Sequence, residues 1–366
     1  MDSKLFTPGP LTTSLTVKKA MLYDLGSRDD DFLDIVKDVR SRLTKLACHR
    51  SNQVNDYTTV LMQGSGTFSV ESVINSCIPK RDPNTKFLVL INGKYAERMK
   101  KIAEKAEIVV ESIDYSELDK INLDDLKVAL EKDKSIKYVG MIHHETSTGQ
   151  LNNITEVGNY LKDKNVTFIV DSMSAFGAVD IDIHESNVDF LVSSANKCIE
   201  GVPGFAFAIC NIEKLKSSTF ATSLSLDLLD QWNNLEKSGQ FRFTPPTHTI
   251  LAFHKALIEY EEEGGLTGRM SRYKENHNLL QEGMSNLGFK SFLPLELQGY
   301  FITSFLYPED NFNFNEFYEY LKSHGLVIYP GKTTDIPSFR IGNIGKLYLK
   351  DIENLLDKVK TYINKI

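Results

Sequence analysis

A short segment rich in glycine and hydroxyl side chains, Gln63 to Thr67 (QGSGT), follows the apolar run Thr59–Met62 and precedes a helical pattern. Glycines let backbone amides come close to an anion, and the start of a helix leaves N–H groups free at the positive end of its dipole. The hydroxyls of Ser65 and Thr67 would add two donors. We therefore predict a phosphate cup formed by Ser65, Gly66 and Thr67. A tight turn capped by a hydroxyl is the alternative.

Two ionisable residues follow apolar runs that are typical of buried strands. Asp171 comes directly after Phe168–Val170, and Lys197 follows Phe190–Val192 within the segment Ser-Ser-Ala-Asn-Lys-Cys. Open α/β sheets keep their sites at the carboxyl ends of their strands. A lysine in a partly apolar pocket loses proton affinity and becomes a nucleophilic amine. A turn-capping aspartate and a surface lysine are the alternatives.

A phosphate cup, an acid and a lysine, in this order on one α/β domain, match the needs of pyridoxal 5'-phosphate (PLP). This cofactor requires a phosphate anchor, a carboxylate beside its pyridine nitrogen and a lysine that forms a Schiff base. A stacking ring would complete the set, and Tyr95, after the run Phe87–Ile91, is a candidate. An ordinary aromatic at a helix start is the alternative. We predict a PLP site with Asp171 and Lys197 as its catalytic residues.

Arg340 stands alone in the short apolar run Ser338–Ile341. An arginine in an apolar strand is seldom buried unless it binds an anion, and its planar fork suits a carboxylate or phosphonate. We predict that it binds an anion; an internal salt bridge is the alternative. No metal site is expected, because His143-His144-Glu145 lacks the HExxH spacing of a zinc site.

The elements that must position these residues form an alternating pattern. Strands that are continuous apolar runs separated by helical stretches are typical of a buried parallel or mixed sheet. The seven runs are Thr59–Met62, Phe87–Ile91, Ile108–Val110, Tyr138–Ile142, Phe168–Val170, Phe190–Val192 and Phe205–Ile209. We expect an α/β fold with a seven-stranded sheet.

Near Thr244-Pro245-Pro246 the pattern changes to long helical stretches and then to mixed strand and helix patterns. We predict an N-terminal arm over residues 1–20, a large α/β domain over 21–260 and a small C-terminal α+β domain over 261–366. The arm is expected to be extended rather than a strand, because the prolines of Thr7-Pro8-Gly9-Pro10 remove ladder donors.

Composition narrows the class of protein. The 366 residues carry 42 Lys and Arg against 49 Asp and Glu, a formal net charge of −7, which argues against a nucleic-acid binder that neutralises phosphates. No apolar run approaches the roughly 20 residues that span a bilayer. Four scattered cysteines without CxxC pairing and an N-terminus without an apolar signal segment favour a reducing compartment. We expect a cytoplasmic enzyme that binds neither nucleic acid nor membrane.

The order and the residues of the motifs resemble those of the class V, alanine–glyoxylate-like aminotransferases, nearly from end to end of the chain. The segments that carry the resemblance are LFTPGPLTTSLTVKKAM (5–21), LMQGSGTFSVE (61–71), HHETSTG (143–149), IVDSMSAFG (169–177), SSANKCIEGVPGFAF (193–207), SLSLDL (223–228), RFTPPTHT (242–249), VIYPGK (327–332) and FRIGNIG (339–345). The fifth, sixth and last are the most particular, and they are similar to the branch that acts on 2-aminoethylphosphonate.

The resemblance implies a fold-type I PLP-dependent transferase that works as a homodimer with shared active sites. Lys197 would form the Schiff base and carry the proton, Asp171 would pair with the pyridine nitrogen, and Arg340 would bind substrate. The residues implied to contact the cofactor are Ser65, Gly66, Thr67, Tyr95, Thr146, Asp171, Asn196, Lys197 and, from the neighbouring subunit, Thr244.

The activity implied by the resemblance is ping-pong transamination of 2-aminoethylphosphonate with pyruvate, which yields phosphonoacetaldehyde and L-alanine in phosphonate degradation. Two alternatives stay open. One is an alanine–glyoxylate or serine–pyruvate aminotransferase of the same family, and the other is a non-catalytic relative that binds PLP. A desulfurase is disfavoured, because Cys198 is fixed beside Lys197 and could not act as a mobile nucleophile.

Overall fold

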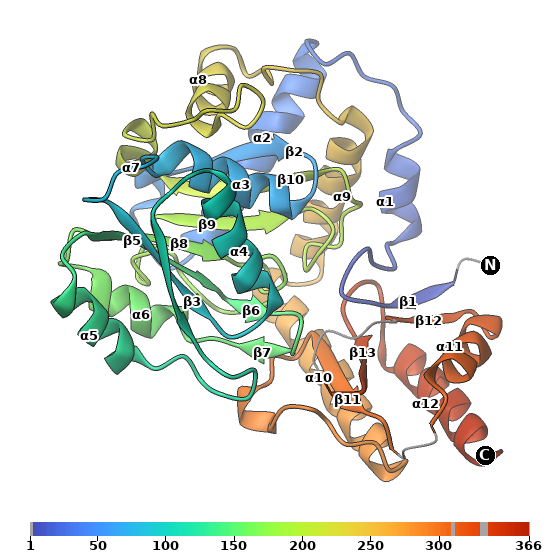
Figure 1. Ribbon diagram of the computed structural model, residues 1–366. Coiled ribbons are helices and arrows are strands. Elements are labelled where there is room, and N and C mark those ends of the chain that lie inside the picture. Colours follow the sequence, from blue (N-terminus) through green and yellow to red (C-terminus); the bar gives the residue numbers. More distant parts are fainter. Residues whose placement is uncertain (1–2, 309–311, 330–335, 366) are drawn as a thin grey trace.

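Seven strands form one sheet in the order β2-β10-β9-β8-β5-β3-β4 (Figure 1). The computed structural model describes residues 3–308, 312–329 and 336–365, so part of the segment VIYPGK lies outside the described residues. The strands are β2 Tyr57–Gln63, β3 Lys86–Ile91, β4 Val110–Asp114, β5 Ile136–Ile142, β8 Thr167–Asp171, β9 Phe190–Ser194 and β10 Phe205–Asn211. All neighbours are parallel except β10, which is antiparallel to β2 and β9. The predicted mostly parallel α/β sheet is confirmed.

The strand expected at Ile108–Val110 begins later than predicted, at Val110, and continues into polar residues as far as Asp114. It lies at the end of the sheet, where one of its edges has no strand partner among the described residues. An edge strand keeps polar side chains because water reaches it, so its apolar pattern marks only its beginning.

Helices cover both faces of this sheet, with α3 and α4 in front and α2 and α9 behind in Figure 1. The helices of the large unit are α2 Asp30–Ala47, α3 Gly66–Cys77, α4 Lys94–Lys105, α5 Leu123–Lys132, α6 Ile154–Leu161, α7 Ile212–Lys216, α8 Leu228–Ser238 and α9 Thr247–Glu262. Because both faces are covered, the central strands are apolar on both sides.

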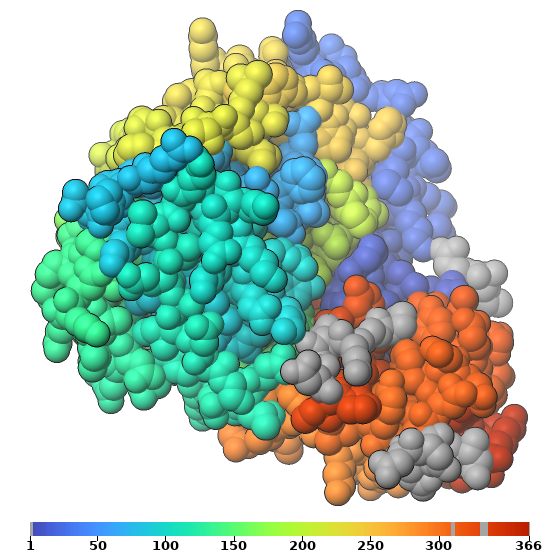
Figure 2. Space-filling model, viewed as in Figure 1, coloured from blue at the N-terminus to red at the C-terminus, as the bar shows by residue number. Residues whose placement is uncertain are grey.

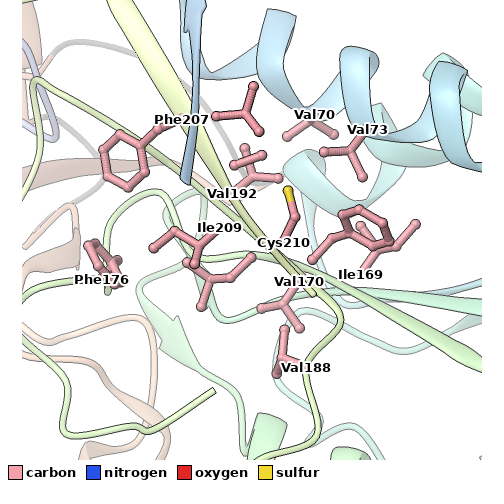
Figure 3. Packing of buried hydrophobic residues seen from close by; sticks show 14 of the residues in the cluster. Val70, Val73, Ile169, Val170, Phe176, Val188, Val192, Phe207, Ile209 and Cys210 are labelled. Atoms are coloured by element: carbon pink, nitrogen blue, oxygen red, sulfur yellow. The ribbon is translucent and has the colours of Figure 1, made fainter. Parts of the chain in front are cut away.

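The packing between α3 and the sheet is shown in Figure 3. Val70 and Val73 of α3 lie over Val192 of β9 and Ile169 of β8, and all four are buried. Burying a side chain of this size stabilises the fold by about 1.5–3 kcal/mol. This core fixes the first turn of α3 relative to the ends of β8 and β9.

A smaller C-terminal unit, drawn in orange and red, packs beside the large unit (Figure 2). It contains α10 Gly265–Asn286, β11 Ile302–Leu306, α11 Phe314–Ser323, β12 Leu326–Ile328, β13 Ser338–Gly342 and α12 Leu349–Ile363. Strands β11 and β13 pair antiparallel. Aromatic residues such as Phe305, Phe317 and Phe339 form a separate apolar core here. The proposed domain limits at residues 20 and 260 remain a prediction.

The N-terminal segment differs from the prediction. Lys4–Phe6 is strand β1, which pairs parallel with β12, and α1 Leu15–Ala20 follows. The prolines come after this strand, so its own N–H groups remain able to pair, and the N–H of Lys4 donates to the carbonyl of Gly325 at 2.8 Å. The expectation of an arm without a strand is therefore wrong. Among the described residues, no helix combines the length and apolar character needed to cross a membrane.

Candidate active site

A cavity of about 170 Å³ opens where β8 and β9 end and α3 begins. This is the carboxyl edge of the parallel strands, where the sequence places the candidate residues. Its lining includes predicted residues from five separate segments: Ser65, Gly66, Thr67, Tyr95, Thr146, Asp171, Asn196 and Lys197. The fold thus brings the predicted cofactor residues together, apart from Thr244.

The predicted phosphate cup is the first turn of α3. Ser65 is the N-cap residue, yet its side chain forms no capping hydrogen bond, so its hydroxyl is available to a ligand. Gly64 has φ +108°, a left-handed conformation that favours glycine. The N–H groups of a first helical turn have no partner within the helix. Together with the Thr67 hydroxyl, which accepts from Arg98 Nη1 at 3.4 Å, they form a donor-rich, positively polarised site.

Asp171 is the last residue of β8 and only 7% of it is exposed. Its Oδ1 accepts a hydrogen bond from the N–H of Met173 at 2.9 Å, so it does cap a turn as well as line the cavity. Burial raises the pKa of its carboxyl to about 6, and the charge of Glu145 adds to this rise. A cation beside the carboxylate, such as a protonated ring nitrogen, would lower that pKa again.

Lys197 lies in the turn that follows β9, where Gly201 N–H donates to Ala195 O at 2.9 Å. It is half-buried rather than a surface lysine. Its Nζ donates to the carbonyl of Pro8 in the N-terminal segment. Burial lowers the pKa of the amine to about 8, so a useful share is unprotonated near neutral pH.

The N-terminal contact with Lys197 was not predicted. Gly9 has φ +115°, and a Cβ on it would lie 3.0 Å from Lys197 Nζ and 2.9 Å from the carbonyl oxygen of Asn196. Only a glycine fits this close approach. The TPGP segment signals an unusual turn in the sequence, but nothing in the sequence shows which residue that turn contacts.

Glu145 is a second residue that the sequence analysis did not single out. It is fully buried and accepts hydrogen bonds from Tyr95 N–H at 3.1 Å, Ala96 N–H at 3.3 Å and Ser147 Oγ at 2.6 Å. Burial raises the pKa of its carboxyl. Its bonds to the first turn of α4 hold Tyr95 at the cavity wall, where the Arg98 guanidinium lies 4.7 Å from the centre of the Tyr95 ring.

Arg340 lies on β13 and is 4% exposed. Its Nη1 donates to the carbonyl of Thr146 at 2.7 Å. The guanidinium also has a hydrogen bond to the Tyr95 side chain. No carboxylate among the described residues forms an ion pair with it, so the alternative of an internal salt bridge finds no support there. Burial lowers the pKa of the guanidinium. The charge of Arg340 in turn helps to lower the pKa of Lys197.

Thr244 lies outside this cavity in its own chain. It is exposed and lines a separate surface hollow with Arg28 and Phe243. Its carbonyl accepts a hydrogen bond from Gln63, the residue just before the cup. A contribution of Thr244 to the site of a neighbouring subunit remains a prediction.

The sequence also matches known proteins. Residues 23–348 match the family model described as aminotransferase class-V. The 2-aminoethylphosphonate–pyruvate transaminase of Bacillus mycoides is 47% identical over 357 residues, which cover 97% of this chain and 96% of that protein. A bifunctional phosphonoacetaldehyde hydrolase/aminoethylphosphonate transaminase of Clostridioides difficile is also 47% identical. The match covers all of this chain but only 57% of that longer protein.

Solved structures show the same fold. The ureidoglycine–glyoxylate aminotransferase of Bacillus subtilis aligns with a TM-score of 0.89 at 20% identity, covering 99% of this chain and 93% of that one. The pyridoxamine–pyruvate aminotransferase of Mesorhizobium loti aligns with a TM-score of 0.87 at 20% identity, covering 100% and 93%. The predicted fold-type I architecture is thereby confirmed.

Proposed function

Because the chain belongs to the class V aminotransferases, we propose that it is a PLP-dependent transaminase that moves the amino group of 2-aminoethylphosphonate to pyruvate. The observation that carries this proposal is a buried arginine, Arg340, that has no ion pair among the described residues and contacts Thr146 in the wall of the cavity that holds Lys197. Such a pair suits a substrate with an acidic group, which the arginine would bind, and an amine, whose carbon the lysine would reach. The names of the relatives at 47% identity narrow that substrate to 2-aminoethylphosphonate.

The residues of the cavity fit PLP. The first turn of α3 offers amide and hydroxyl donors to a phosphate, and Asp171 offers a buried carboxylate to a ring nitrogen. Tyr95 would cover one face of the ring, while Thr146 and Asn196 would line its edge. When bound, PLP supplies an electron sink for the carbon that bears the substrate nitrogen.

The chain's own groups would bind the substrate and move its proton. Arg340 would hold the phosphonate in one half-reaction and the carboxylate of pyruvate in the other, with the reacting carbon directed toward Lys197. The amine of Lys197, with a pKa of about 8, would take a proton from that carbon. It would then donate the proton again later in the transfer of the amino group. A base whose pKa lies near the working pH is suited to this step. Asp171 would keep its negative charge beside the ring nitrogen.

A homodimer belongs to this proposal. Several large apolar side chains are exposed in and after α1, in α3 and in the segment before α8, and a second copy of the chain would cover them. They include Leu15 at 65%, Leu22 at 79%, Tyr23 at 68%, Phe68 at 49% and Leu224 at 75%. Thr244, which is exposed on the same chain, would then reach the phosphate cup of the neighbouring subunit.

Steady-state kinetics with different substrate pairs test the proposal. Purified protein loaded with PLP is assayed with 2-aminoethylphosphonate, alanine or serine as donor, and with pyruvate or glyoxylate as acceptor. We expect kcat/KM for 2-aminoethylphosphonate and pyruvate to exceed the other pairs by at least about tenfold, because Arg340 and its surroundings select the acidic group. A preference for serine or alanine with glyoxylate would favour the alternative aminotransferases. Bound PLP without turnover of any pair would favour the non-catalytic relative.

A further inference from the structure

Neutral groups hold the side chain of Arg340 in a fixed orientation. Its Nη1 donates to the Thr146 carbonyl at 2.7 Å, and the centre of the Tyr329 ring lies 4.6 Å from its Cζ. Its Nε–H is buried and has no hydrogen-bond partner among the described residues. A buried donor without a partner is costly, and a ligand that supplies an acceptor removes that cost.

The backbone places Tyr329 against Arg340. Tyr329 follows β12 and forms an isolated antiparallel bridge with Arg340, in which Tyr329 N–H donates to Arg340 O at 3.2 Å. Residues directly opposite each other in an antiparallel pair direct their side chains to the same face. The contact between the ring and the guanidinium therefore follows from strand pairing.

We propose that Tyr329 is a positioning residue that fixes the plane of the Arg340 guanidinium, so that its Nε–Nη2 edge meets the acidic group of the substrate. The proposal rests on the proposed function and deepens it. Nη1 is tied to Thr146, one face is covered by the Tyr329 ring, and the Tyr95 hydroxyl also bonds the guanidinium. The edge that carries the unpartnered Nε–H is therefore the part of the guanidinium left for a ligand. Two parallel N–H···O bonds in one plane are the strong form of this interaction.

Tyr329, like Arg340, is absent from the lining of the cavity that holds Lys197 and Asp171. Its loss should therefore weaken the binding of acidic groups and leave the proton transfer intact. A merely structural role would instead lower stability, PLP content and kcat together. The separation of KM from kcat thus distinguishes positioning from structural support.

Equilibrium binding to the PLP-loaded protein provides the direct test. Calorimetry measures the Kd of ethylphosphonate, which has the phosphonate but no amine, and of pyruvate. We expect Tyr329→Leu to raise both Kd values roughly tenfold, the order expected for a desolvated cation–π contact. Tyr329→Phe, which keeps the ring, should stay within about twofold of wild type. The KM for 2-aminoethylphosphonate should follow the Kd, with kcat unchanged.

A matched control comes from Tyr318, whose ring lies 5.6 Å from Lys322 Nζ on the surface of the small unit. Tyr318→Leu should leave both Kd values unchanged. If Tyr329→Leu does not fold, Tyr329→Met keeps an apolar side chain of similar reach without the ring, and the same prediction applies to it. In an Arg340→Lys background, loss of the Tyr329 ring should have no further effect.

The proposal would be overturned if Tyr329→Leu bound both ligands with the Kd values of wild type. It would also be overturned if Tyr329→Phe raised the Kd values as much as Tyr329→Leu. A wrong assignment of the substrate would give a different result. If wild type binds pyruvate but not ethylphosphonate, the phosphonate assignment is contradicted, while the pyruvate series still decides the role of Tyr329.

Discussion

Burial shifts the protonation of the two central groups toward their neutral forms. The pKa of the Lys197 amine falls to about 8 and that of the Asp171 carboxyl rises to about 6. These shifts suit opposite tasks, because a lysine needs a neutral amine to react, whereas Asp171 needs a cationic ring nitrogen to restore its charge. Both residues were predictable from sequence, since each follows a buried strand.

Replacing Lys197 tests its role as the proton carrier. Lys197→Ala should lower kcat by at least about a thousandfold, because a positioned base contributes this much to a proton transfer. The measurement is alanine formation from pyruvate, together with the PLP content. Lys80→Ala is the control, since the Lys80 amine donates to the Asn75 and Phe220 carbonyls instead. Substantial activity in Lys197→Ala would contradict the assignment.

Asp171→Asn should stabilise the cofactor-free protein while abolishing activity. The folded-state pKa of about 6 lies above the ordinary 3.8, so the folded state loses stability as pH rises between these values. Above pH 6 this cost is about 3 kcal/mol, at 1.36 kcal/mol per pKa unit. Denaturant unfolding should show a gain of about 2–3 kcal/mol for the variant at pH 8 and little difference near pH 4.

The exposed Asp163→Asn serves as the control for this comparison. A variant that is less stable than wild type at pH 8 would contradict this prediction, because it would show that contacts within the cofactor-free protein stabilise the carboxylate of Asp171.

At the scale of elements, the N-terminal segment joins the two units at the active site. Strand β1 pairs with β12 of the small unit, and the turn that follows brings the Pro8 carbonyl to Lys197. The sequence predicted the seven strands of the sheet because buried strands are continuous apolar runs. It did not reveal β1, whose partner lies about 320 residues away, because local patterns carry no information on long-range pairing.

Gly9→Ala tests the turn that contacts Lys197. The added Cβ would meet Lys197 Nζ at 3.0 Å and would strain a backbone with φ +115°. We expect kcat/KM to fall by more than about tenfold, since a displaced catalytic group loses its geometry. Gly288→Ala is a matched control, because Gly288 also has a positive φ of +87° but no atom within 4 Å of the added Cβ. Equal effects of the two substitutions would contradict a specific role for the turn.

At the scale of the whole molecule, the large unit supplies the cavity and the small unit supplies Arg340. The positions of Lys197, Asp171 and the cup were predictable, because the carboxyl ends of parallel strands share one edge of the sheet. Glu145 and Tyr329 were not, since their roles arise from contacts between segments far apart in the chain. Thr244 lies away from the cavity of its own chain, as a residue donated to a neighbour would.

Phe243→Asp tests the proposed dimer. Phe243 is 43% exposed beside Thr244, so a charge there would disfavour burial against a second chain. By analytical ultracentrifugation we expect wild type at twice the chain mass of 41.4 kDa and the variant at one chain mass, with weaker PLP binding. Leu118→Asp, at a residue 46% exposed elsewhere on the surface, should stay dimeric. A dimeric Phe243→Asp protein with unchanged PLP affinity would contradict this interface.

Transamination of 2-aminoethylphosphonate is tested most directly by the near-visible absorbance of the PLP-loaded protein, recorded while 2-aminoethylphosphonate is added without pyruvate. We expect the band of bound PLP to convert fully to that of pyridoxamine phosphate, and the addition of pyruvate to restore it with one equivalent of alanine. A band that stays unchanged with 2-aminoethylphosphonate but converts with another amino donor would contradict the proposed substrate. Protein that shows no band after incubation with PLP would contradict the role of Lys197.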